Sequence, residues 1–202
     1  MVQSQVKLLH SHAEQFQKEM GVLYLPQLEF IDLKTERKIR ERCKREERKK
    51  WLDPRQKWLG SYYSKEITQG FTLDVTIKWI DECVGYGVFT NVPIVNRAYI
   101  GEYTGIVRKR RFFAEMKNHY CFDYTIGIGR KTPYVIDAAG CGNYARYINH
   151  STDGNIETAS VLCNGIMHII MYATESIPKG AQLCYDYGAD YWARRKAPIV
   201  LR

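Results

Sequence analysis

The pattern of hydrophobic and polar positions divides the chain into an N-terminal part and a longer part of different texture. From Gly70 onward, hydrophobic residues alternate with polar ones over short stretches that glycine and proline turns interrupt. Short strands without regular intervening helices predict a β-rich α+β domain. The predicted extended segments are residues 71–80, residues 84–93 as a glycine-hinged pair of strands, residues 99–107 as one strand, and residues 168–177.

Residues 1–68 are predicted to form a helical, basic N-terminal extension with a short extended or turn segment at residues 23–26. Val6, Leu9 and Ala13 have the spacing of an amphipathic helix. This helical spacing differs from the alternating pattern that begins at Gly70, which indicates that residues 1–68 are organised differently from the rest of the chain.

The excess positive charge is concentrated in residues 34–57, which hold twelve basic and five acidic residues in a chain of net charge +8. Acidic residues lie four positions before basic ones, as in Glu41 and Arg45, which favours a solvent-exposed helix with ion pairs along its surface. Asp53-Pro54 is expected to interrupt or end it. The alternative is a docking face for nucleic acid or an acidic partner.

Composition limits the compartment and the chemistry. A chain of 202 residues with 45% hydrophobic content can bury the core of one domain. No apolar run approaches the roughly 20 residues that a membrane helix needs, and the N-terminus lacks the order of a secretory signal. We therefore expect no membrane partner and a cytoplasmic protein. The six cysteines form no CxxC or CxC pair, so free thiols are expected.

Four further stretches contain residues that serve packing poorly. Asn149 and His150 are rich in donors and acceptors, so a buried pair needs partners or costs a few kcal/mol. Taken singly, each stretch is equally compatible with a turn or a core edge, and the two glycines around Tyr86 are typical of a β-bulge. The stretches are VGYGVF at 84–89, GEYTG at 101–105, GNYARYINHS at 142–151 and LCYDYGADYW at 183–192.

Taken together and in this order, the four stretches resemble the motifs of the SET-domain protein lysine methyltransferases. The resemblance includes YCFD at 120–123 and IDA at 136–138, and it covers about residues 71–192. Its most specific part is the pair INHS and YDYG, about 35 residues apart. It implies a SET-domain fold over residues 69–190, in which the INHS stretch threads under the C-terminal loop in a knot-like crossing. Residues 191–202 would form a closing segment.

The resemblance implies S-adenosyl-L-methionine as cofactor and assigns roles to residues of this chain. Asn149 and His150 would bind near the adenine, and Tyr191 or Trp192 would cover it. Tyr187 would lie at the transfer point. The full set implied for cofactor binding is Gly85, Tyr86, Gly87, Tyr120, Arg146, Asn149, His150, Tyr187, Tyr191 and Trp192, and the set implied for catalysis is Tyr187, Tyr103 and Tyr185.

Elementary chemistry agrees with these roles. A sulfonium methyl group is already electrophilic, so the enzyme needs in-line geometry and a neutral amine, and no metal. A free lysine, with a pKa of about 10.4, is mostly charged at neutral pH. A narrow channel with tyrosine walls, at Tyr103, Tyr120, Tyr185 and Tyr187, would desolvate the ammonium group and lower its pKa.

Two departures from the common family pattern predict a site without zinc. Many members read NHSC and end in a cysteine-rich segment, whereas this chain has Thr152 and a tail without cysteine. The tail would then close the site by packing through Tyr191, Trp192, Ile199 and Leu201. This compact layout looks like the SET proteins of bacteria that live inside eukaryotic cells, which act as effectors. As an alternative to the cytoplasm, this resemblance implies a protein that is secreted into a host cell and is nuclear there.

The sequence thus predicts a protein lysine methyltransferase of a basic, histone-like protein, with an exposed lysine as the acceptor. The resemblance also implies mainly mono- or dimethylation, because SET enzymes that stop at these states commonly have a tyrosine at the position of Tyr185, two before Tyr187. A nucleic-acid- or chromatin-binding protein with an inactive SET module is the alternative from another class, and non-histone targets such as ribosomal proteins are the alternative among enzymes. A homodimer is left open.

Overall fold

The computed structural model describes residues 13–111, 118–127 and 131–192. Residues 13–20 are helical, followed by α2 (Leu33–Arg48), α3 (Pro54–Tyr62), α4 (Ser64–Gln69), the 3₁₀ helix η1 (Tyr144–Tyr147) and α6 (Ala189–Trp192). The strands are β1 (Leu23–Tyr24), β2 (Glu29–Phe30), β3 (Val75–Asp81), β4 (Gly85–Thr90), β5 (Tyr99–Glu102), β6 (Ile106–Lys109), β7 (Cys121–Thr125), β8 (Lys131–Asp137), β9 (Cys141–Gly142), β10 (Asn149–His150), β11 (Ile156–Cys163), β12 (Ile166–Ala173) and β13 (Cys184–Tyr185). Short strands predominate, which confirms the β-rich α+β prediction.

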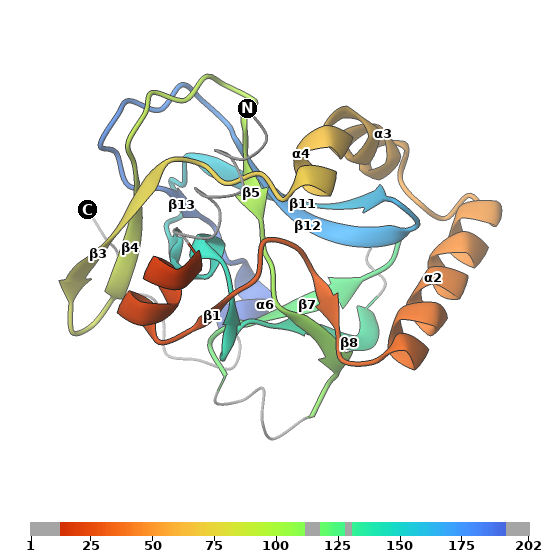
Figure 1. The fold of residues 1–202 in the computed structure, drawn as a ribbon. Coiled ribbons are helices and arrows are strands. Elements are labelled where there is room, and N and C mark those ends of the chain that lie inside the picture. The colour runs from red at the N-terminus through yellow and green to blue at the C-terminus, as the bar shows by residue number, and fades with distance from the viewer. Residues whose placement is uncertain (1–12, 112–117, 128–130, 193–202) are drawn as a thin grey trace, which may run out of the picture.

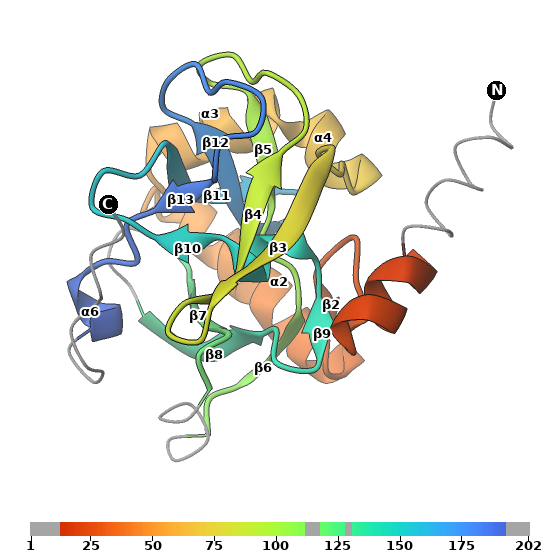
Figure 2. The same cartoon turned by 90° about the vertical axis from the view of Figure 1, so that its left-hand side faces the viewer.

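Within the described residues, the strands form small sheets rather than one large sheet (Figures 1 and 2). Their strand orders are β2-β6-β8-β7, β11-β12-β5, β3-β4, β1-β9 and β10-β13. The pairs β1-β9, β2-β6 and β10-β13 are parallel and join segments that are distant in sequence. Two of these pairs connect the N-terminal part of the chain to strands of the later part.

Two predicted strand assignments are wrong in detail. Residues 84–93 contain one strand, β4 (Gly85–Thr90), which pairs with β3, and the tight turn lies before it at residues 82–84. Gly85, with a φ of 78°, is the first residue of the strand after this turn. Residues 99–107 form β5 and β6, which belong to different sheets. Gly105 lies at this crossing, where a Cβ atom would be only 2.6 Å from the carbonyl oxygen of Asp137.

The basic segment forms two helices with well-defined ends. The amide of Thr35 donates to Asp32 at 2.6 Å and caps the start of α2. Helix α2 ends at Arg48, and Pro54 is the first residue of α3, whose start is closed by a capping box from Asp53. The prediction that Asp53-Pro54 interrupts the helix is therefore confirmed.

The helices α2, α3 and α4 cover β11 and β12 on the side of the molecule away from the β3–β4 hairpin (Figure 1). Ile39 and Cys43 of α2 are buried in the main core, which the β12 residue Met167 also joins. Helix α3 can approach β11 closely because Gly60 has no side chain. A Cβ atom at this position would clash with the carbonyl oxygen of Leu162. The hydroxyl of Tyr124 donates to the carbonyl oxygen of Met167 at 2.9 Å and fixes β7 against β12.

Two expectations from composition meet the structure directly. All six cysteines are free thiols, as predicted. In the part of the chain that the structure describes, no helix is long and apolar enough to cross a membrane.

Candidate active site

The candidate site is built where β10 and β13 lie side by side (Figure 2). In this parallel pair, Asn149 is opposite Cys184 and His150 is opposite Tyr185. The amide of Ser151 extends the pairing by donating to the carbonyl oxygen of Tyr185 at 3.1 Å. The pairing brings the polar pair of the INHS motif beside the tyrosines of the YDYG motif. The threading of one segment under the other stays a prediction.

The turn after β10 fastens the two segments together. The side-chain amide of Asn155 donates to the carbonyl oxygen of Gln182 at 2.9 Å, and its oxygen accepts from the amide of Cys184 at 3.1 Å. A Cβ atom at Gly154 would lie 2.7 Å from the carbonyl oxygen of Cys184, so only glycine permits this approach. Gly154 and Asn155 therefore have a structural role here.

Asn149 connects this pair to the β3–β4 hairpin. Its Nδ2 donates to the carbonyl oxygen of Tyr86 at 3.0 Å. At the adjacent Gly87, a Cβ atom would lie 3.1 Å from Asn149 Nδ2 and 2.9 Å from Gln182 Nε2. A side chain at this position would displace both amides, so the glycine keeps the polar edge of the site open.

His150 is oriented by the backbone of the facing segment. The amide of Tyr187 donates to His150 Nδ1 at 3.1 Å, so the neutral ring carries its hydrogen on Nε2. The indole of Trp192 packs edge to face on the ring, with centroids 5.0 Å apart. Asp186 Oδ1 lies 3.5 Å from the same Nδ1. The imidazole therefore has a fixed plane and a fixed tautomer.

Tyr187 stands at the centre of the aromatic cluster that follows β13. Its hydroxyl donates to the carbonyl oxygen of Ile148 at 2.7 Å. Its ring centroid lies 4.8 Å from that of Tyr185 and 4.7 Å from that of Tyr191. Burial raises the pKa of Tyr187 well above its ordinary value, and the neighbouring tyrosine Tyr185 adds to the effect. The hydroxyl therefore stays protonated and cannot serve as a base at neutral pH.

Tyr103 and Tyr185 form the buried wall beside Tyr187. They are 5% and 7% exposed, and burial raises the pKa of both phenols well above the ordinary value. The ring of Phe122 packs on Tyr103 with centroids 5.3 Å apart. Since the phenol groups are neutral and the aromatic rings are apolar, this wall favours a neutral amine over an ammonium ion.

Arg146 forms a second cluster with two tyrosine rings. Its guanidinium carbon lies 3.7 Å from the ring centroid of Tyr120 and 4.6 Å from that of Tyr147. Its Nη2 donates to the carbonyl oxygen of Ala139 at 3.1 Å, and its Nη1 donates to the hydroxyl of Tyr147 at 2.5 Å. Tyr86 packs edge to face on Tyr147, with centroids 5.8 Å apart, and connects the cluster to the hairpin.

Three buried donors of the site have no hydrogen-bond partner among the described residues. They are Arg146 Nε, Gln182 Nε2 and Trp192 Nε1. Leaving a buried donor unsatisfied costs roughly 1–3 kcal/mol. Together with the open edge at Gly87 and the carboxamide of Asn149, these donors fit a polar ligand that carries several acceptors.

A scan against protein-family models finds the SET domain at residues 85–188, just over half of the 202-residue chain. The chain belongs to the SET-domain family. This confirms the resemblance drawn from the motifs, and the match includes β4, β10 and β13, which build the site.

Curated relatives and solved structures agree with the SET-domain assignment. The chain is 33% identical over 111 residues to histone-lysine N-methyltransferase ash1 of Drosophila melanogaster, a match over 51% of this chain and 5% of that protein. It is 31% identical over 130 residues to N-lysine methyltransferase KMT5A-A of Danio rerio, over 60% of this chain and 37% of that protein. The structure matches ctPRC2 in an autoinhibited conformation bound to S-adenosylmethionine, with a TM-score of 0.52, 31% identity, and coverage of 60% of this chain and 16% of that chain. The chain thus spans well under half the length of these proteins.

The SET domain gathers the predicted residues into two adjoining groups. His150, Tyr185, Tyr187, Tyr191 and Trp192 form the aromatic cluster after β13. The second group is held by Tyr147 and consists of Tyr86, Tyr120 and Arg146, and Asn149 connects to it through the Tyr86 carbonyl. Gly85 is the exception, because a Cβ atom there would meet no atom within 4 Å. Gly85 begins β4 directly after the hairpin turn with a φ of 78°, which gives it a backbone role.

Sequence reasoning missed three contributors to the site. Ile148 acts through its carbonyl oxygen, which the sequence cannot indicate, because the contact depends on the backbone path. Gln182 brings a buried donor beside Gly87. Tyr147 contacts the rings of both Tyr86 and Tyr120, and its position directly before the INHS motif was the available signal.

The closing segment is described only as far as Trp192. Helix α6 holds Tyr191 and Trp192 against Tyr187, with Trp192 and Tyr187 stacked at 6.1 Å between centroids. The predicted contributions of Ile199 and Leu201 lie outside the described residues. Within the ranges 13–111, 118–127 and 131–192, no group of three or more His, Cys, Asp or Glu side chains is placed to hold a metal ion.

Proposed function

We propose that this SET domain is a protein lysine N-methyltransferase that uses S-adenosyl-L-methionine. The observation that carries the proposal is the position of Tyr187, whose hydroxyl is fixed on the Ile148 carbonyl directly beside the Asn149–His150 pair. A neutral, oriented phenol beside a polar ligand site suits a transfer reaction that depends on alignment. The names of the relatives, which are lysine methyltransferases, support the same activity.

The residues of the site fit the cofactor. Asn149 and the backbone near Gly87 would hold its polar groups, and the unsatisfied donors of Arg146, Gln182 and Trp192 would meet its carboxylate, ribose and adenine acceptors. When bound, the cofactor supplies a methyl group on a positively charged sulfur. We further propose that α6 closes this side by packing, without zinc.

The substrate amine would enter between the tyrosine rings. Because the proton of Tyr187 is held by the Ile148 carbonyl, the lone pairs of its oxygen are free to accept an N–H of the amine. The nitrogen lone pair would then stay free for the methyl group that the bound cofactor would supply. The apolar wall of Tyr103 and Tyr185 lowers the pKa of the amine by desolvation, so the proton leaves to solvent before the transfer.

Tyr185 is proposed to limit the number of methyl groups added. It is buried, and its ring lies 4.8 Å from that of Tyr187. A hydroxyl here would hold a water or the amine, and each added methyl group would have to displace it without replacing its hydrogen bonds. Mainly mono- and dimethyllysine would follow.

The proposed substrate is a basic, histone-like protein with an exposed lysine, and non-histone basic proteins such as ribosomal proteins are the second class. The support comes from relatives whose names specify histones, at 27–33% identity. Contact with nucleic acid through residues 34–57 is proposed on the charge of that segment. Its basic side chains are nearly all exposed, along α2, the connection after it and the start of α3.

Incubation with S-adenosyl-L-methionine carrying a labelled methyl group tests the activity, with histones and bacterial basic proteins as substrates. We expect label on lysine in at least one basic protein, and loss of it with Tyr187→Phe. Equal labelling by the unmodified protein and by Tyr187→Phe would contradict the proposal. Cofactor binding without label on any substrate would also contradict it and would favour a binding module.

A further inference from the structure

A groove of about 560 Å³ lies outside the candidate active site, between β2, the start of α2, the end of α4 and the β11–β12 turn. This volume falls in the range of about 300–1,000 Å³ that is usual for ligand sites. Figure 2 shows β2 on one side of the molecule and β13 and α6 on the other. The lining residues used below are Leu28, Glu29, Phe30, Asp32, Glu36 and His168.

His168 of β12 contributes a buried, unsatisfied nitrogen to this groove. The residue is 8% exposed, and its Nδ1 lies 2.6 Å from the Oε1 of Glu102, which is 3% exposed. Since a carboxylate only accepts, the hydrogen lies on Nδ1, and the neutral ring presents Nε2 as an acceptor. Nε2 has no partner among the described residues. A buried acceptor without a donor is available to a group that brings an N–H.

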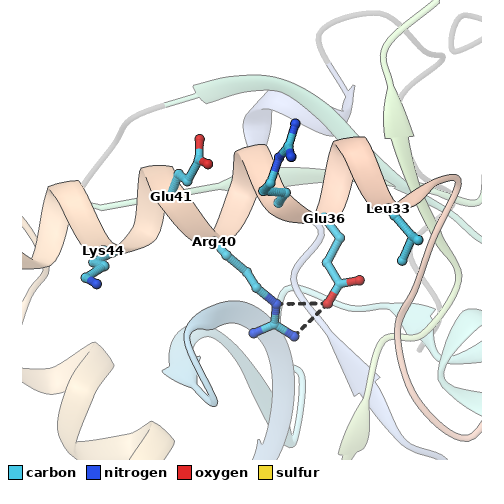
Figure 3. Close-up of a pocket in the computed structure, with 6 residues that line it drawn as sticks. Leu33, Glu36, Arg40, Glu41 and Lys44 are labelled. Atoms are coloured by element: carbon cyan, nitrogen blue, oxygen red, sulfur yellow. Dashed lines mark hydrogen bonds and ion pairs between the residues drawn. The ribbon is translucent and has the colours of Figure 1, made fainter.

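The rim of the groove is acidic, although the whole chain has a net charge of +8. Glu29 and Asp32 are both exposed. The third acid, Glu36, is neutralised by Arg40 at 2.8 Å, and Arg40 in turn donates to the carbonyl oxygen of Asn164 at 2.7 Å. Figure 3 shows this pair, with the two side chains directed toward each other beneath α2. Glu29 and Asp32 form no ion pair among the described residues, although Asp32 accepts from the Thr35 amide and its charge is partly offset by Lys34. The negative charge of the rim therefore comes mainly from Glu29, with a smaller share from Asp32.

The walls of the groove are apolar, with Leu28, Phe30 and Ile166 among them. Lysine and arginine side chains pack their methylene stems on such surfaces while their charged ends reach polar partners. An acidic rim, an apolar wall and an acceptor at the base together match a cationic side chain better than an anion or an apolar ligand.

We propose that this groove binds a basic segment of a polypeptide. A lysine or arginine side chain of the segment lies along Leu28 and Phe30 with its charge at Glu29 and Asp32, and an N–H group of the segment donates to His168 Nε2. Binding is independent of the cofactor and of methyl transfer.

Fluorescence anisotropy without cofactor tests the proposal, using a short labelled peptide in which alanine alternates with lysine and arginine. The double variant Glu29→Gln, Asp32→Asn should weaken binding at least about tenfold. Asn remains a good N-cap, so the second change removes charge without removing the cap of α2. His168→Asn keeps a donor for Glu102 but removes Nε2, and should weaken binding about fivefold or more.

Glu175→Gln is the matched control, because Glu175 is exposed and does not line the groove. It should bind within about twofold of the unchanged protein. Equal weakening by this control, or unchanged binding by the double variant, would overturn the proposal. Binding of N-acetyl-arginine amide as tight as that of the peptide would overturn the assignment to a polypeptide. These binding measurements involve no methyl transfer. Their outcome is therefore independent of whether the proposed methyltransferase activity is correct.

Discussion

The hydroxyl of Tyr187 donates a 2.7 Å hydrogen bond to the carbonyl oxygen of Ile148, the residue directly before the Asn149–His150 pair. The amide of Tyr187 also donates to His150 Nδ1 at 3.1 Å. One residue of the YDYG motif is thus fastened at two points to the INHS motif. This relationship determines both the orientation of the phenol and the direction of its lone pairs.

Replacement of Tyr187 by Phe removes the oriented oxygen and keeps the aromatic ring. We expect kcat for methyl transfer to fall at least about tenfold, a barrier increase of about 1.4 kcal/mol or more. Cofactor affinity should change much less, because Asn149 and the Gly87 edge are untouched. Single-turnover rates and calorimetric titration of the cofactor measure the two quantities. A variant with unchanged turnover would show that the hydroxyl has no part in the transfer.

The pH dependence of turnover distinguishes the substrate amine from the tyrosine. Burial raises the pKa of Tyr187 well above its ordinary value, so its hydroxyl stays protonated, while the neutral fraction of the lysine amine increases with pH. We expect kcat/KM to rise with pH and to show no decrease up to about pH 10 from tyrosine ionisation. The profile is measured on a peptide substrate with both proteins. A decrease near the ordinary tyrosine pKa that disappears in Tyr187→Phe would contradict this.

The sequence brings the residues of the candidate site together better than it predicts the strands around them. Asn149, His150 and Tyr187 lie within short motifs that resemble those of the SET family, and the roles that this resemblance implies stay predictions. The contact that orients Tyr187 comes instead from the backbone of Ile148, which no residue type signals. Similarly, the two-residue strands β1 and β2 pair with β9 and β6 through backbone hydrogen bonds, and such short segments carry too few residues for a periodic pattern.

Replacement of Tyr185 by Phe tests the control of product state. The change removes a buried hydroxyl beside Tyr187 and leaves space for a methylated amine in its place. The unmodified protein should yield mainly mono- and dimethyllysine, and the variant should shift toward trimethyllysine at a similar total rate. Intact-mass analysis of a peptide after long incubation measures the products. Dominant trimethylation by the unmodified protein would exclude this role for Tyr185.

Neutralising Lys49 and Lys50 with glutamine tests the basic segment. Both residues are exposed after the end of α2, and Lys49 Nζ lies 4.3 Å from the ring centroid of Trp51. Association with whole substrate or nucleic acid should weaken, and the loss should decrease as salt is raised. Turnover on a short peptide should stay unchanged. Equal losses on both substrates would indicate a structural role for the segment.

Removal of metal tests the closure of the site by packing. Calorimetry on EDTA-treated protein should detect binding of S-adenosyl-L-methionine or its demethylated product, because the proposed binding groups are the side chains of Asn149, Arg146 and Trp192 and the backbone near Gly87. Absence of binding that added zinc restores would contradict a zinc-free site.

The most direct measurement of the central claim is the transfer of a labelled methyl group from S-adenosyl-L-methionine to basic proteins, followed by mass spectrometry of the labelled residue. The account predicts label on a lysine side chain with the unmodified protein, and at least about tenfold less with Tyr187→Phe at equal cofactor saturation. Cofactor binding without any transfer to lysine, or transfer that is equal in the two proteins, would contradict it.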